Sequence, residues 1–249
     1  RATNTWDYPT YLLLMSLGYL LPVLPTLLPS DGETTRSPWR YLHLLMPLAL
    51  FVLAEILFRP YTTRYVTTYT SIEPWQGART PLSDYLVMHG QFLVPVALLA
   101  LGSFLPLWRR LKRERGMWTG LGIVAVGALL LTLVLHAMGV RAAWIAVPLG
   151  TLAALLLLTS RERPRRQTLW LWVGSALALT LMVEVIVLRG DIGRMNTVFK
   201  FYLQVWILLA TAAAIATEAL LSTVLWAGTE EGLAARSPII RAFAENRHS

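Results

Sequence analysis

The stretch MWTGLGIVAVGALLLTLVLHAM (117–138) decides the fold class of this protein. About 20 apolar residues in a helix cross the ~30 Å hydrocarbon core of a bilayer, and this stretch is long enough and holds no acidic residue, lysine or arginine. The whole chain agrees, because 55% of its 249 residues are hydrophobic and 14% are charged. Strands with open edges cannot span lipid, since their backbone groups would lack hydrogen-bond partners. We therefore predict an all-α, polytopic bundle of transmembrane helices.

Other apolar stretches of similar length lie on both sides of this one. Together they give about seven predicted spans: 8–28, 41–58, 86–108, 117–138, 142–159, 168–188 and 197–226. We expect one transmembrane helical domain over residues 1–228 and a cytoplasmic tail over 229–249. The first span starts almost at Arg1, so we also expect the chain to be part of a larger protein, whose N-terminal part would be a partner of these helices.

The basic residues predict the topology. Two short loops between spans, 109–116 and 160–167, carry runs of arginine and lysine in a chain of net charge +8. Short basic loops stay on the cytoplasmic side, and counting crossings from them puts loops 59–85 and 189–196 on the non-cytoplasmic side. We therefore predict a protein integral to the inner or plasma membrane. The same rule explains the positive charge, so no nucleic-acid partner is expected.

The polar stretch RGDIGRMNTVFKFYLQVW (189–206) stands at the mouth of the last span. If a helix begins near Asn196, then Asn196, Lys200 and Gln204 recur at every fourth residue and form one polar stripe. Arg194 and the positive helix N-terminus add to the potential there, which favours a bound phosphate. The alternative interpretation is that Lys200 reaches the interface along its apolar stem and anchors the helix. Asp191 fits a helix N-terminal acid, a metal ligand or a partner for an arginine.

Carboxylates inside the predicted spans are the next candidates for function. Glu55, Glu184 and Glu218 lie toward the ends of their spans, where a carboxylate either reaches water, pairs with a neighbouring arginine or serves function. The four histidines show no metal-ligand spacing. The chain contains no cysteine, which excludes disulfides and thiolate metal sites.

Three stretches resemble a known family: NTWDYPTY (4–11), GARTPLSDYLVMHGQFL (77–93) and GRMNTVFKFYLQVW (193–206). They resemble the YYY-type family of uncharacterised polytopic membrane proteins, which is grouped by distant similarity with the GT-C glycosyltransferases. The resemblance covers essentially the whole chain and corresponds to the C-terminal part of the family's membrane domain. It implies sugar transfer from a polyprenyl-phosphate donor at the non-cytoplasmic face, often with a divalent metal. The catalytic carboxylate of such enzymes usually lies in the first outer loop, which we expect upstream of residue 1, so the chain alone would lack activity.

Sequence pattern and resemblance agree on a non-cytoplasmic site that holds phosphate. An inverting transferase needs a carboxylate to activate the acceptor hydroxyl and cations to stabilise the leaving lipid phosphate. Asp7, Asp84 and Asp191 are the candidates for the first role. The candidates for the second are Arg194, Asn196, Lys200 and Gln204. The partners would be membrane lipid and a lipid-linked sugar. Two alternatives remain: a transporter or flippase for a lipid-linked or anionic solute, and a non-catalytic scaffold subunit.

Overall fold

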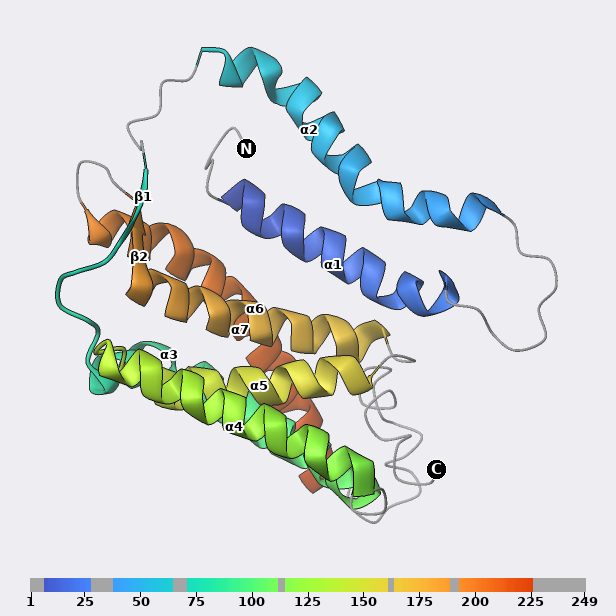
Figure 1. The fold of residues 1–249 in the computed structure, drawn as a ribbon, viewed down its shortest axis with the longest axis vertical. Coiled ribbons are helices and arrows are strands. Elements are labelled where there is room, and N and C mark those ends of the chain that lie inside the picture. The colour runs from blue at the N-terminus through green and yellow to red at the C-terminus, as the bar shows by residue number, and fades with distance from the viewer. Residues whose placement is uncertain are drawn as a thin grey trace.

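The computed structural model describes residues 7–27, 38–64, 71–111, 115–160, 164–188 and 193–225. Within them the prediction of an all-α bundle is confirmed, because seven α-helices make up the architecture (Figure 1). These are α1 (Asp7–Leu27), α2 (Met46–Thr62), α3 (Leu82–Leu111), α4 (Arg115–Ala137), α5 (Ala143–Thr159), α6 (Pro164–Val185) and α7 (Arg194–Leu225), with a 3-10 helix, η1 (Pro38–Leu45), leading into α2.

Five helical segments of the described chain are long and apolar enough to cross a membrane. They are Tyr41–Tyr61, Leu82–Arg109, Trp118–Ala137, Pro164–Val185 and Arg194–Thr223. Helix α5 is also apolar but shorter. The protein is therefore an integral membrane protein with several candidate spans, and the predicted crossings by α1 and α5 stay predictions.

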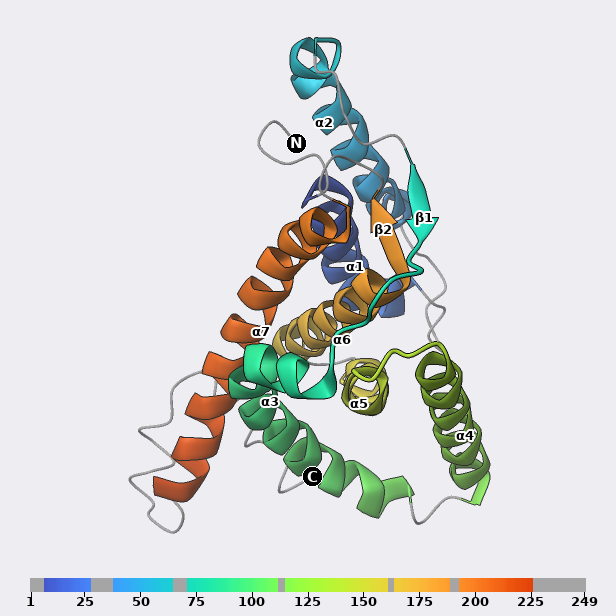
Figure 2. The same ribbon diagram turned by 90° about the vertical axis from the view of Figure 1, so that its left-hand side faces the viewer.

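Helix α6 lies at the centre of the bundle, between α5 and α7, and α3 packs against both α7 and α5 (Figure 2). Small side chains let these helices approach closely, as is usual in membrane bundles. Ala146 and Ala153 of α5, Ala176 of α6, and Ala212 and Ala216 of α7 are all fully buried. The core of the molecule is therefore the group α3, α5, α6 and α7.

Helices α1 and α2 lie to one side of this group (Figure 1). Helix α1 packs against α6, and α2 packs against α1. The apolar span of α2 has none of its residues buried, and side chains such as Leu53, Ile56 and Leu57 are exposed. A largely apolar helix whose residues are not buried by protein is suited to lipid.

Two short strands form an antiparallel sheet that the sequence did not predict. Strand β1 (Ile72–Pro74) pairs with β2 (Ile186–Leu188), with Glu73 opposite Val187. The predicted span 168–188 is thus wrong at its end, because α6 stops at Val185. At that point the N–H of Trp75, the residue after β1, donates to the Val185 carbonyl at 2.8 Å, and residues 186–188 pair with β1 instead of forming a further helical turn.

The sheet marks one end of the bundle, which we call the sheet end. The beginnings of α3 and α7 and the turn between α4 and α5 lie there, and they face the viewer in Figure 2. The last residues of α3 and α5 and the first residues of α4 and α6 lie at the opposite end (Figure 1). This is the grouping expected from counting crossings, and the side of the membrane on which each end lies stays a prediction.

Candidate functional site

Residues 71–81, which we call the strap, lead from β1 to α3 across the ends of α6 and α7. Within the strap, the Trp75 indole N–H donates to the Ala78 carbonyl at 2.9 Å, and Arg79 donates to the Trp75 carbonyl at 2.7 Å. A Cβ at Gly77 would lie 2.2 Å from the Trp75 ring, so only glycine leaves room for the folded-back indole. The resulting tight turn presents Ala78 and Thr80 to the helix ends.

Arg194, the first residue of α7, is the centre of the contacts beneath the strap. Its guanidinium donates to the Ala78 carbonyl at 2.9 Å, to the Thr80 hydroxyl at 3.1 Å and, through Nε, to the Val183 carbonyl at 3.3 Å. It also forms an ion pair with Glu184 of α6, and it lies over the Trp75 ring, 5.6 Å from the centroid. Arg194 therefore ties the strap, α6 and α7 together.

Glu184 is buried, with 1% of its side chain exposed. The Thr80 hydroxyl donates to its Oε1 at 2.6 Å, and the Thr80 backbone N–H donates to its Oε2 at 3.1 Å. Both carboxylate oxygens thus have donors besides Arg194. Of the roles left open for Glu184 by the sequence, pairing with a neighbouring arginine is confirmed. Because the pair is neutral as a whole, the positive charge of Arg194 is compensated within the protein.

The predicted polar stripe lies on another side of α7, toward α1. Gln204 is 1% exposed, and its Nε2 donates to Oδ1 of Asp7 at 2.5 Å. Its Oε1 is buried and has no hydrogen-bond partner in the described part of the chain. Lys200 and Asn196 are half-buried. The fold therefore joins Asp7, one predicted catalytic candidate, to the predicted phosphate stripe.

Helix geometry explains why the predicted site is divided. Helix α7 begins at Arg194, not near Asn196 as predicted. At about 100° per residue, Arg194 stands about 160° from Asn196 and about 120° from Lys200 around the helix. Arg194 thus faces Glu184 and the strap, whereas the stripe faces α1. The prediction that Arg194 binds lipid phosphate stays a prediction, although its charge already has a carboxylate partner.

A buried aromatic cluster, which the sequence did not predict, lies between α3, α6 and α7. The Tyr85 hydroxyl lies 3.3 Å from Thr180 Oγ1, and His89 Nδ1 lies 3.2 Å from the Tyr85 carbonyl, to which it donates. The His89 ring is fully buried and meets the Tyr202 ring edge-on, with 5.0 Å between centroids. Its Nε2 has no partner within the described residues. The spacing of Tyr85 and His89 at i and i+4 is the signal that could have indicated this cluster.

Comparison with known families assigns the chain. Residues 1–209 match the family described as Uncharacterized membrane protein (DUF2298). The chain belongs to this family. The predicted resemblance to an uncharacterised family of membrane proteins is confirmed at this level, and the likeness of this DUF2298 chain to GT-C glycosyltransferases stays a prediction. No curated protein and no solved structure matches the chain.

The remaining carboxylate candidates lie apart from the stripe or outside the described residues. Asp84 is exposed in the first turn of α3, where it accepts from the Ser83 hydroxyl at 3.0 Å. An acidic residue there is favourable to the helix dipole, which accounts for Asp84 without a catalytic role. Asp191 lies outside the described residues.

The metal that the resemblance implies does not fit the described part of this DUF2298 chain. Divalent cations such as Mg²⁺ and Ca²⁺ take carboxylate oxygens as ligands. Within the described ranges, no three His, Asp or Glu side chains gather closely enough to hold a metal ion.

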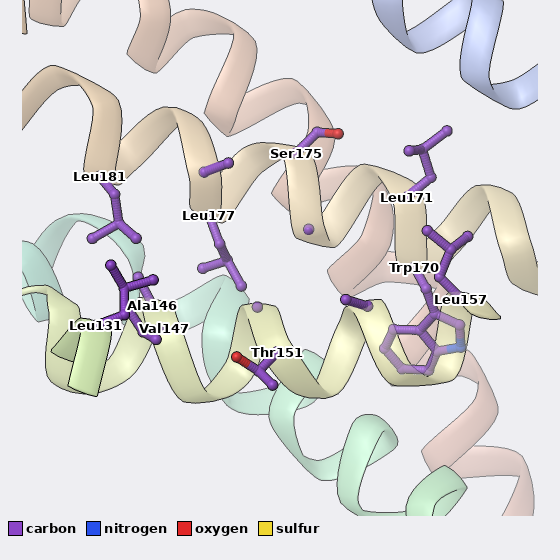
Figure 3. A pocket seen from close by; sticks show the side chains of 14 residues that line it. Leu131, Ala146, Val147, Thr151, Leu157, Trp170, Leu171, Ser175, Leu177 and Leu181 are labelled. Carbon is purple, nitrogen blue, oxygen red and sulfur yellow. The ribbon is translucent and has the colours of Figure 1, made fainter. Parts of the chain in front are cut away.

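One groove between the helices is apolar and lies on the other side of α6 from α7. It has a volume of about 420 Å³ and lies between α5 and α6, with Leu131 of α4 at its edge (Figure 3). Leu181 points from α6 toward Ala146 and Val147 of α5, and Leu177 points toward α5 near Thr151 (Figure 3). Its lining includes hydroxyls but no charged side chain. The groove therefore suits an apolar chain and not a phosphate.

Proposed function

We propose that this chain is part of a GT-C-like integral membrane glycosyltransferase that uses a polyprenyl-phosphate sugar donor at the non-cytoplasmic face. The observation that carries the proposal is the hydrogen bond between Asp7 and Gln204, residues that are 197 apart in sequence. It joins a carboxylate to the polar stripe of α7, and these are the two kinds of group that such a reaction requires. The sheet end would be the non-cytoplasmic end, as the basic loops predict.

Lys200 would supply the charge that stabilises the leaving lipid phosphate. It stands one turn before Gln204 and six residues after the first residue of α7, about 9 Å along the helix. A lysine at that depth can extend its ammonium toward the head-group region. Asn196 and Gln204, one turn to either side, would add neutral hydrogen bonds to the same phosphate. Developing negative charge on the leaving oxygen is stabilised most by groups that are already in place.

Asp7 would take the proton of the acceptor hydroxyl, as a general base. Gln204 holds one of its oxygens, which orients the carboxylate. Arg194, paired with Glu184, would act differently from the stripe. It fixes the start of α7 against the strap and so sets the direction in which Lys200 and Gln204 point.

The test compares the two lysines of the chain, Lys200 and Lys112. In the full-length protein, we expect Lys200→Met to weaken the affinity for a short-chain polyprenyl-phosphate analogue by about 10- to 100-fold, the loss of one charge-assisted contact. Lys112→Met removes the same charge in a loop predicted to be cytoplasmic and should leave the affinity unchanged. Asp7→Asn should lower the rate of sugar transfer with little effect on this affinity.

Two results would contradict the proposal. Equal affinities of the two lysine variants, with both folded, would leave Lys200 as an interface anchor. Movement of the intact lipid-linked sugar across the bilayer by the full-length protein, with no transfer of sugar to any acceptor, would favour the transporter alternative.

A further inference from the structure

Arg79 extends from the strap in a different direction from the contacts of Arg194. Its stem lies against the turn between α4 and α5, because a Cβ on Gly139 would come within 3.4 Å of Arg79 Cγ. Gly139 adopts a φ of +87°, which favours glycine, and its N–H donates to the His136 carbonyl at 2.8 Å. The turn thus bends tightly and leaves room for the arginine beside it.

The guanidinium of Arg79 has no carboxylate partner in the described part of the chain. One terminal nitrogen donates to the Trp75 carbonyl at 2.7 Å. The other, Nη1, is buried and has no hydrogen-bond acceptor among the described residues. An arginine side chain is always charged, and a desolvated charge without compensation is costly. An anion close to Arg79 would therefore compensate this charge.

Arg141 adds a second positive charge next to this position. It lies two residues after Gly139 in the same turn, so its Cα is within about 7 Å of the glycine. Its side chain is exposed, while its carbonyl accepts from the Trp144 N–H at 3.3 Å. Both arginine side chains are long enough to meet over the turn. Helix α4 ends and α5 begins here, so the opposed helix dipoles largely cancel. The positive potential at the turn therefore comes from the two arginines.

We propose that Arg79 and Arg141 form a binding site for a phosphate group at the sheet end, over the turn between α4 and α5. The planar fork of arginine matches two phosphate oxygens. Two arginines carry two positive charges, and a phosphate group balances them more fully than a single carboxylate does. The phosphate comes from a lipid head group or from a soluble phosphate. This site lies apart from the α7 stripe, and it does not depend on the function proposed for that stripe.

The experiment measures phosphate binding by the full-length protein in non-ionic detergent and phosphate-free buffer. The soluble probe is inorganic phosphate, and the lipid probe is dioctanoyl phosphatidic acid, with dioctanoylglycerol as a control of equal chains and no phosphate. The variants are Arg79→Gln and Arg141→Gln. Arg64→Gln is the matched control, because Arg64 is an exposed arginine of the loop that leads to the strap.

One of the two phosphate probes should bind the wild type. We expect Arg79→Gln to lower the affinity for that probe by about 10- to 100-fold. Arg141→Gln should weaken the binding less, because that side chain is exposed, and Arg64→Gln should not change it. Tighter binding of phosphatidic acid than of inorganic phosphate identifies a lipid source, and the reverse identifies a soluble one. The proposal is overturned if the wild type binds neither probe, or if every folded variant of Arg79 and Arg141 binds as the Arg64→Gln control does. Arg141→Gln keeps the test valid if the Arg79 variant fails to fold.

Discussion

Arg194 and Arg79 both place a guanidinium against the strap, but their surroundings differ. Arg194 has a carboxylate, a hydroxyl, two carbonyls and an indole face around it. Arg79 has the Trp75 carbonyl and a buried nitrogen that lacks a partner among the described residues. A charge that is neutralised inside the protein holds the fold together, whereas one that is not neutralised is available to a ligand. We infer that Arg194 is mainly structural and that Arg79 is the better candidate for binding an anion.

The largest expected effect comes from removing the carboxylate partner of Arg194. Glu184→Gln keeps the size of the side chain but leaves a desolvated guanidinium without its counter-charge. We expect it to lower the free energy of unfolding by about 3 kcal/mol, as for other broken buried pairs. Unfolding in detergent micelles measures it. Asp84→Asn, an exposed acid, is the control and should cost less than about 1 kcal/mol. If the two variants lose equal stability, the pair contributes little and the comparison fails.

A smaller effect should follow from changing Thr80, which contacts both members of the pair. Thr80→Val keeps the backbone N–H bond to Glu184 but removes the hydroxyl that donates to Glu184 and accepts from Arg194. We expect a loss of about 1–3 kcal/mol, the usual cost of hydrogen bonds to charged groups. In the Glu184→Gln background the same change should cost measurably less, because the two residues share one network. Full additivity of the two losses would show that Thr80 acts independently of Glu184.

The spans could be predicted from the sequence because the apolar runs are long and the bilayer requires helices. Helix α4 begins and ends within two residues of the predicted 117–138. The division of the candidate site could also have been predicted. Placing the first residue of α7 at Arg194 is sufficient, since Arg194 and Lys200 then stand on different faces of the helix.

Other features could not be predicted, because they depend on contacts between distant residues. Strands of three residues are too short to show an alternating pattern, so neither β1 nor β2 stood out. The bond between Asp7 and Gln204 joins residues 197 apart in sequence, and no local pattern indicates it. The choice of Arg194 rather than water as the partner of Glu184 depends on where the strap lies, which the sheet pairing determines.

The smallest effect on stability is expected for Arg79→Met. Making the same substitution at Arg194 compares the two arginines directly. Arg194→Met leaves Glu184 buried without its cation and should cost about 3 kcal/mol of the free energy of unfolding. Arg79→Met loses the bond to the Trp75 carbonyl but also removes the buried nitrogen that lacks an acceptor. These two contributions are each about 1 kcal/mol and oppose one another, so the net change should stay below about 1 kcal/mol in phosphate-free buffer. A phosphate ligand should then stabilise the wild type more than the Arg79→Met variant, because the protein that binds the ligand more tightly gains more stability from it. Equal losses for Arg79→Met and Arg194→Met, with or without phosphate, would mean that both arginines are structural.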